Sequence, residues 1–376
     1  MAFEQDIDEI VRIVRTVDVS FNDVDQEAVL AALSDLKTKD SKEAFLLSAM
    51  QTLAMAKNGH TRIIPNHVAS LLPIRFVAIG KEIYLTEGHE TSAGVRLQSV
   101  NGISVSEIQS RFLPYLAGNS GRQAAISALL FAWPTALQTI NVISDDTITY
   151  EFTNGSTFVT TAKSAKTGSS LYPTFETGTP TLPDPRKFDC HKIANALHIT
   201  LPSFGPNANV EENLATVIET ISANPNQKII LDLRGNHGGN FFLSLPLIDY
   251  LEQEGSNRTK AILVDKFTFS AAIVFVAIAR TRLGNLKIIG EEMGDATRFY
   301  AEGDTLTLPQ TGALLRYSTV YHDWREGNFD ATTPDAIIKH LVAAGDLVPD
   351  VQPQITLYDL QNGKDACLDM ALSLIA

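Results

Sequence analysis

Cysteine is nearly absent from this sequence, which contains two, Cys190 and Cys367, among 376 residues. So few cysteines cannot form the disulfide framework of a small secreted protein. The sequence also lacks a Cys-x-x-Cys or His-x-x-x-His pair with the spacing of a metal site. We therefore expect two buried free thiols, no bound metal and no cofactor.

Positive charge is also scarce. The 30 lysines and arginines are outnumbered by 43 aspartates and glutamates, which gives a net charge of −13, and the basic residues form no run. This balance disfavours nucleic acid and anionic membrane surfaces as partners. No apolar run is long enough to span a membrane. The acidic start, Met1 to Glu9, lacks the apolar core of a signal peptide, which predicts a cytoplasmic protein, or a periplasmic or secreted one if a leader was removed.

No internal repeat is evident, and the length exceeds what one hydrophobic core usually supports. Apolar residues recur at helical spacing near the N-terminus, over 5–17, over 24–37 and from a capping box at Asp40 onward. An Asn-Gly turn between alternating runs predicts a hairpin over 139–163, and 164–190 is expected to be a linker or a loop over the site. We predict a helical domain over 1–70, a cap region over 71–165 and a larger domain over 166–376.

The most informative stretch is 228–282. An apolar run ends in Asp232-Leu-Arg234, and the glycine loop Gly235-Asn-His-Gly-Gly-Asn240 follows it. A second apolar run, 261–265, leads through Thr268-Phe-Ser270 into an apolar helix pattern. Alternating strands and helices predict an α/β fold with a parallel sheet, whose ligands bind beyond the carboxyl ends of the strands. Asp232 and Arg234 are interpreted as an ion pair that holds the loop.

Ser270 has two interpretations. Serine is a favoured N-cap, and most serines before an apolar helix only cap it. The alternative is a nucleophile at a strand-to-helix turn, where the helix N-terminus and the glycine loop supply N–H donors to an oxyanion. The Gly-x-Ser-x-Gly sequence of ordinary α/β-hydrolases is absent, which argues against that fold.

The motifs together resemble one family. Asp232-Leu-Arg-Gly-Asn-x-Gly-Gly239, then Thr268-Phe-Ser-Ala-Ala272, are similar to the tail-specific, or C-terminal processing, serine peptidases. The segments Ile288 to Glu291, Val348 to Val351 and Gly363 to Asp365 resemble later motifs of the same superfamily. The resemblance implies a catalytic domain related to crotonase and ClpP. The stretch around Asn101-Gly102 resembles part of a PDZ-like module, but the short segment before it favours a structural lid or cap.

The resemblance also implies a base. The superfamily's processing enzymes carry a lysine in a Gly-Lys pair about 25 positions after the serine, and Gly294-Asp295 stands there. The branch of the tricorn core and interphotoreceptor retinoid-binding protein instead carries an early histidine, and Asn58-Gly-His60 matches it. We therefore expect Ser270 as nucleophile and His60 as base. His237 is a rival base, and His67 should be tested beside His60.

The remaining site residues follow from the same resemblance. The N–H groups of Gly238 and Ala271 are expected to bind the oxyanion. The acid that orients the histidine is expected to be Glu326, with Asp323 and Asp346 as alternatives. The sequence thus predicts a serine-type peptidase that acts on a peptide or protein substrate, with a homo-oligomer possible. An inactive ligand- or peptide-binding protein and an enzyme on another acyl substrate remain as alternatives, because a fold does not fix a function.

Overall fold

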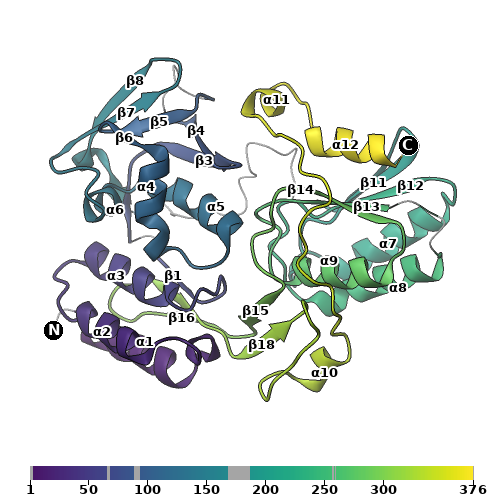
Figure 1. Cartoon of the computed structure of the whole chain (residues 1–376), viewed down its shortest axis with the longest axis horizontal. Coiled ribbons are helices and arrows are strands. Elements are labelled where there is room, and N and C mark those ends of the chain that lie inside the picture. Colours follow the sequence, from purple (N-terminus) through teal and green to yellow (C-terminus); the bar gives the residue numbers. More distant parts are fainter. Residues whose placement is uncertain are drawn as a thin grey trace. The chain divides into compact units, whose positions relative to one another are not determined.

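The computed structural model describes residues 3–65, 68–88, 94–167, 187–255, 258 and 260–375 (Figure 1). The chain divides into two compact units. Unit 1 comprises Met1–Asn119, Gln123–Thr177 and Tyr300–Val320, and unit 2 comprises Ser120–Arg122, Gly178–Phe299 and Tyr321–Ala376. The predicted helical domain and cap region therefore share one unit. His67 and most of the predicted loop 164–190 lie outside the described residues.

Unit 1 begins with three helices close to the predicted ranges, α1 (Glu4–Thr16), α2 (Gln26–Leu36) and α3 (Lys42–Ala54). Their apolar faces are buried, as the helical spacing predicts. The predicted capping box at Asp40 is wrong by one residue, because the hydroxyl of Ser41 accepts the hydrogen bond from the Ala44 N–H. The carboxylate of Glu43 instead binds the indole N–H of Trp133, 3.1 Å away.

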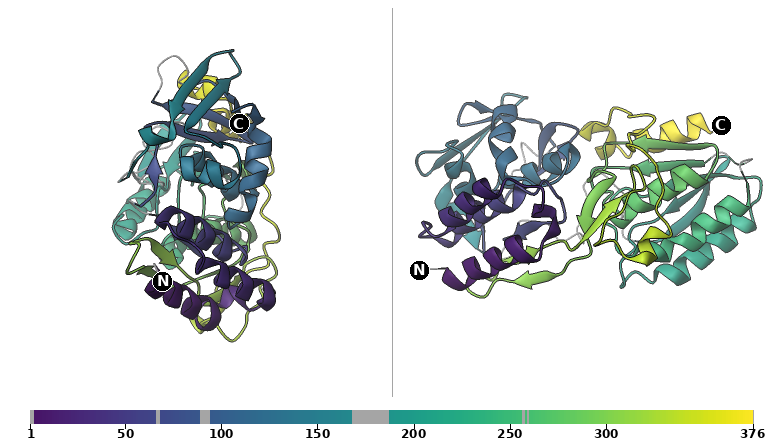
Figure 2. Two further views of the ribbon diagram at one scale, coloured as in Figure 1. Left: turned by 90° about the vertical axis from the view of Figure 1, so that its left-hand side faces the viewer. Right: turned by 60° about the horizontal axis from the view of Figure 1, so that its bottom comes forward.

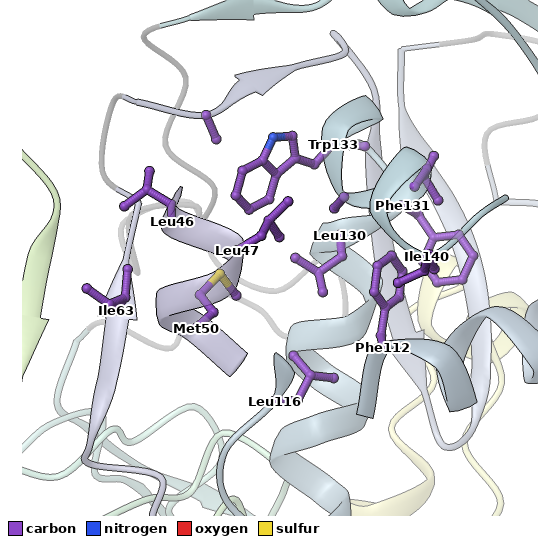
Figure 3. Packing of buried hydrophobic residues seen from close by; sticks show 14 of the residues in the cluster. Leu46, Leu47, Met50, Ile63, Phe112, Leu116, Leu130, Phe131, Trp133 and Ile140 are labelled. Carbon is purple, nitrogen blue, oxygen red and sulfur yellow. The ribbon is translucent and has the colours of Figure 1, made fainter. Parts of the chain in front are cut away.

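The cap region contributes a four-stranded sheet in the order β6-β5-β7-β8 and a separate hairpin of β3 and β4. The predicted Asn-Gly hairpin is confirmed, since β7 and β8 pair antiparallel on either side of that turn. One continuous core joins the region to the N-terminal helices, and Figure 3 shows Met50, Phe112, Leu130 and Trp133 within it. The elements are β3 (Arg75–Ile79), β4 (Glu82–Glu87), β5 (Leu97–Val100), β6 (Ile103–Ser104), α4 (Val105–Phe112), α5 (Ser120–Leu130), α6 (Pro134–Thr139), β7 (Thr147–Phe152) and β8 (Thr157–Thr161).

Residues 300–320 return to unit 1, which the sequence patterns did not predict. Strand β17 (Leu314–Arg316) pairs antiparallel with both β1 (Arg62–Ile64) and β16 (Thr305–Thr307). Leu308, Ala313 and Leu315 join the core of unit 1. The strand that follows the His60 loop is therefore completed by a segment more than 240 residues further along the chain.

Unit 2 contains a five-stranded sheet in the order β10-β11-β12-β13-β14. The last four strands are parallel, which confirms the predicted α/β fold, and β10 pairs antiparallel with β11. Figures 1 and 2 show α7, α8 and α9 on one face of the sheet and α12 on the other. These elements are β10 (Asp189–Ile193), β11 (Ala196–Thr200), α7 (Val210–Ser222), β12 (Lys228–Asp232), α8 (Leu245–Gln253), β13 (Lys260–Val264), α9 (Ala271–Arg282), β14 (Leu286–Gly290) and α12 (Ala366–Leu374).

The remaining elements are short. Strands β15 and β18 form a two-stranded sheet at the two points where the chain passes between the units. Within the described residues, no helix is both long enough and apolar enough to cross a bilayer. The short elements are η1 (Val19–Phe21), β2 (Ser70–Leu71), η2 (Leu113–Tyr115), η3 (Ala162–Ser164), β9 (Lys166–Thr167), η5 (Phe241–Ser244), β15 (Arg298–Ala301), β18 (Val320–Asp323), α10 (Asp335–Ile338) and α11 (Leu357–Gln361).

Candidate active site

Ser270 occupies the N-cap position of α9 with a backbone conformation that serine rarely adopts, φ 57° and ψ −125°. A residue with a Cβ in such a region costs on the order of 1–3 kcal/mol, so the surrounding structure must impose it. The side chain is half-buried and makes no capping hydrogen bond to α9. The capping interpretation of Ser270 therefore does not describe what its hydroxyl does.

The turn before Ser270 is held by Asp265, which follows β13. One oxygen of its carboxylate accepts the N–H groups of Phe267 and Thr268, at 3.0 and 2.9 Å, and the N–H of Gly235 at 3.0 Å. Burial raises the pKa of Asp265 to about 6, although the hydrogen bond from Gly235 opposes this shift. The sequence analysis missed this residue, although it stands at the end of β13 as Asp232 does at the end of β12.

The glycine loop lies directly against Ser270. A Cβ on Gly238 would approach the Cβ of Ser270 and the carbonyl oxygen of Phe269 to 2.7 Å each, and its φ is +93°. A Cβ on Gly239 would meet the carbonyl oxygen of Phe204 at 2.1 Å. Only glycine allows backbone-to-backbone contact on both sides of the loop. The Gly-Gly pair therefore lets the main chain at Gly238 lie next to Ser270 while Gly239 lies against Phe204.

Two predicted oxyanion donors lie at this contact. Ala271 is the first residue of α9, and the first N–H groups of a helix have no partner within the helix. The N–H of Gly238 donates to the side-chain oxygen of Asn236, at 2.8 Å. Asn236 is fully buried, and its amide also donates to the Leu201 carbonyl at 2.8 Å. The Ala271 N–H thus has no acceptor within α9, whereas the Gly238 N–H is bound to Asn236.

His60 belongs to unit 1, where it is buried between two anchored neighbours. The Asn58 amide donates to the hydroxyls of Thr61 and Ser318, at 3.1 and 2.9 Å. The hydroxyl of Thr61 donates in turn to the buried carboxylate of Asp18, at 2.7 Å. Burial raises the pKa of Asp18 although these hydrogen bonds oppose the shift. The loop that carries His60 is therefore fixed on both sides of the histidine.

The three candidate acids differ in their surroundings. Asp323 is fully buried and accepts the Arg325 and Glu326 N–H groups, at 3.1 and 2.9 Å, and also binds Arg298. Burial opposes ionisation there, but the Glu326 N–H and Arg298 hold its pKa below the usual value. Glu326 and Asp346 are exposed, and they pair with Arg298 and Arg325, each at 3.2 Å. Asp323 is thus occupied in shaping its own turn, whereas Glu326 and Asp346 are accessible.

The pair Gly294-Asp295 lies beside the turn that precedes Ser270. The Gly294 N–H donates to the Thr268 carbonyl at 2.9 Å, and a Cβ on Gly294 would meet the Lys266 carbonyl oxygen at 2.5 Å. Asp295, the next residue, is buried. It stands at the position where the sequence analysis expected the lysine of a processing enzyme. The nearby Lys266 is buried and bound to Glu291 at 2.7 and 2.9 Å, a pair that the sequence analysis missed.

Two further histidines lie near the glycine loop. His237 is half-buried, and its ring packs edge-on against Phe267, with ring centroids 5.9 Å apart. His198 lies on β11, and its Nε2 forms a hydrogen bond with the carboxylate of Asp232 at 3.0 Å. The predicted ion pair of Asp232 and Arg234 is confirmed, with 2.5 Å between Nη2 of Arg234 and Oδ2 of Asp232. Among the described residues, no group of three or more His, Cys, Asp or Glu side chains could hold a metal ion.

Unit 2 therefore brings together Ser270, Gly238 and Ala271 at the carboxyl edge of the parallel sheet. Glu326 belongs to the same unit and lies after β18, paired with Arg298. His60 belongs to unit 1. A half-buried serine in a strained turn, at a helix N-terminus and against a glycine loop, suits nucleophilic attack on a carbonyl with main-chain stabilisation of the oxyanion.

Comparison with known proteins gives similarities of fold. No protein-family model and no curated protein matches the chain. Among solved structures, the chain is similar to a putative peptidase from Parabacteroides merdae (15% identity, TM-score 0.48, covering 100% of this chain and 97% of that one). It is also similar to the photosystem II D1 C-terminal processing protease (14% identity, TM-score 0.42, covering 100% and 97%). A third similarity is to the tricorn protease (12% identity, TM-score 0.43, covering 100% of this chain and 36% of that one).

Proposed function

We propose that this chain is a serine peptidase with Ser270 as its nucleophile. The observation that carries the proposal is the strained turn at Ser270, whose hydroxyl does not cap α9 and whose backbone touches Gly238. A structural serine gains nothing from this conformation, whereas a nucleophile gains exposure of its hydroxyl beside N–H donors. The resemblance of the motifs to C-terminal processing and tricorn-like peptidases supports the same assignment.

In the proposed mechanism, Oγ of Ser270 attacks the carbonyl carbon of a peptide bond while its proton passes to His60. The tetrahedral oxyanion binds the N–H of Ala271 and the N–H of Gly238, which releases the Asn236 side chain. His60 then protonates the leaving amine, and an acyl-enzyme remains on Ser270. Water attacks the ester, gives its proton to His60, and the acid product leaves as Ser270 recovers its proton.

The carboxylate that would orient His60 is proposed to be Glu326. Its side chain is exposed and shares Arg298 with Asp323, so the carboxylate is accessible to an imidazole in a way that the buried Asp323 is not. Asp346 is equally exposed and stays an alternative. His237 remains the rival base, because it belongs to the same loop as Gly238. A peptide or protein substrate and a homo-oligomeric enzyme belong to the same proposal.

A second candidate function is an inactive binding protein of this fold. Two observations favour it: the Gly238 N–H is already bonded to Asn236, and Asp295 stands where a lysine base would. Asp295 cannot act as the neutral amine that a serine–lysine dyad needs.

The same serine could also act on a non-peptide acyl substrate, which a panel of ester and thioester substrates would reveal.

The decisive experiment is intact-mass labelling with a fluorophosphonate, in which Oγ displaces fluoride from phosphorus. We expect one adduct on the wild type and none on Ser270→Ala. Loss of labelling in His60→Ala but not in His237→Ala would support His60 as base, and the reverse result would move the base to the glycine loop. His67→Ala serves as the matched histidine control. An unlabelled, folded wild type would overturn the proposal and leave the binding function.

A further inference from the structure

Asp365 is the N-cap of the C-terminal helix α12, and its carboxylate makes two sets of bonds. As the N-cap, it accepts the N–H groups of Cys367 and Leu368, each at 3.1 Å. The same carboxylate binds the guanidinium of Arg234 with both oxygens, at 2.8 and 2.7 Å. The N-cap of α12 is thus joined by a bidentate pair to Arg234, the residue directly before the glycine loop and 131 positions earlier in the chain.

Arg234 is held equally firmly on its other side. Its Nε and Nη2 donate to the two oxygens of Asp232, at 2.9 and 2.5 Å, and its own N–H donates to Oδ1 at 3.1 Å. The side chains of Arg234 and Asp232 are 6% and 8% exposed, so both charges are out of water. Burial opposes ionisation, yet Arg234 and His198 hold the pKa of Asp232 well below its usual value. Removing either carboxylate would leave this buried guanidinium with one ionic partner in place of two, which costs free energy in a site out of water.

The position of Arg234 determines where the glycine loop starts. The next N–H, that of Gly235, is fixed to Asp265, and Asn236 then bonds the Gly238 N–H. Because Gly238 touches Ser270, a shift of Arg234 would displace the proposed oxyanion donor. Helix α12 itself is anchored to the sheet by Cys367, Ala371 and Ile375, which pack against the strands. The ion pair between Arg234 and Asp365 therefore connects helix α12, packed on the sheet, to the start of the glycine loop.

We propose that Asp365 is a positioning residue for the oxyanion loop, so that the docking of α12 through Asp365 and Arg234 sets the reactivity of Ser270. The inference rests on the proposed function, because it assigns a role in stabilising the oxyanion. Without the Asp365 charge, Arg234 keeps one buried ionic partner, Asp232, and its guanidinium shifts toward that carboxylate. The loop that follows Arg234 then loses one of the ion pairs that hold its start, although the Gly235 N–H stays bound to Asp265. We expect the donor at Gly238 to move relative to Ser270 as a result.

The test is Asp365→Asn, since asparagine caps a helix about as well as aspartate but cannot hold the guanidinium as an ion pair. Asp369→Asn is the matched control, because Asp369 lies exposed in the first turn of the same helix. Asp365→Glu restores the charge and should recover part of the rate. Saturation kinetics of fluorophosphonate labelling separate the initial binding constant from the rate of phosphonylation, whose transition state places oxygen in the oxyanion hole.

We expect Asp365→Asn to slow phosphonylation by about tenfold or more, with the initial binding constant unchanged, and Asp369→Asn to match the wild type. Amide hydrogen exchange, read in the folded proteins, should be faster over 235–240 in Asp365→Asn alone, and this readout does not depend on activity. An unchanged phosphonylation rate and unchanged loop exchange in Asp365→Asn would overturn the inference while the peptidase proposal stands. Failure of the wild type to label would overturn both.

Discussion

The carboxylate of Asp265 accepts a hydrogen bond from the N–H of Gly235, 3.0 Å away, and thereby ties the turn before Ser270 to the glycine loop. These two segments come from the ends of neighbouring strands, β12 and β13. Because the same oxygen also accepts the N–H groups of Phe267 and Thr268, a single buried carboxylate sets both parts of the candidate site.

This arrangement gives a pH dependence with a definite sign. Burial raises the pKa of Asp265 from 3.8 to about 6, so the folded protein binds more protons than the unfolded chain between these values. The stability that the neutral form contributes is complete below about pH 4 and is lost as the pH rises through 6. We expect the free energy of unfolding of the wild type, measured in urea relative to Asp265→Asn, to fall by roughly 2–3 kcal/mol from pH 4 to pH 7. A difference that is constant or rises with pH would contradict this assignment.

The strain at Ser270 predicts opposite effects on stability and function. Glycine adopts φ 57° and ψ −125° without the clash of a Cβ, whereas alanine retains that clash. We expect Ser270→Gly to unfold at higher urea than Ser270→Ala, by about 1 kcal/mol or more, while neither variant is labelled. Equal stability of the two variants would show that the turn is unstrained.

The Gly-Gly pair should tolerate no side chain. In Gly239→Ala, the new Cβ would meet the Phe204 carbonyl oxygen at 2.1 Å and the Gly205 nitrogen at 2.4 Å, and these backbone atoms cannot rotate away as a side chain could. We expect a loss of about 3 kcal/mol or more in the free energy of unfolding. Gly255→Ala is the control, because Gly255 also has a positive φ, +79°, but a Cβ there meets nothing within 4 Å. The control should lose only about 1 kcal/mol, and similar losses in both variants would contradict the packing argument.

The hydrogen bonds beside His60 should matter for stability as well as for activity. Thr61→Val keeps the shape of the side chain but removes the hydroxyl that binds Asp18, Asn58 and Ser318. We expect a loss of about 1–3 kcal/mol, because the buried carboxylate of Asp18 loses a donor. Thr139→Val, at an exposed position on α6, is the control and should change stability by less than about 0.5 kcal/mol.

A rate measurement on the same pair of variants extends this test to function. Fluorophosphonate labelling should slow in Thr61→Val and stay unchanged in Thr139→Val, because only the first substitution loosens the loop that carries His60. Normal labelling in a destabilised Thr61→Val would separate the loop's stability from the proposed role of His60.

Local patterns in the sequence were enough to predict the two central strands of unit 2. Short apolar runs predicted the strands that the structure places at β12 and β13, and alternation with helices predicted that the two strands are parallel. The sequence also determined the strand-to-helix turn at Ser270 and the glycine loop beside it, because periodicity and glycine are local properties of the chain. The close approach of Gly238 to Ser270 follows from two consecutive strand ends in one parallel sheet.

Which polar groups meet became apparent only in the folded chain. The bonds of Arg234 to Asp365 and of Asn58 to Ser318 join residues 131 and 260 positions apart. Nothing in a local pattern encodes such a partner, because any buried charge or amide needs a partner and the fold selects one. The same reason explains why the bond from the Gly238 N–H to Asn236, although local, was not predicted: it depends on Asn236 being buried against the Leu201 carbonyl.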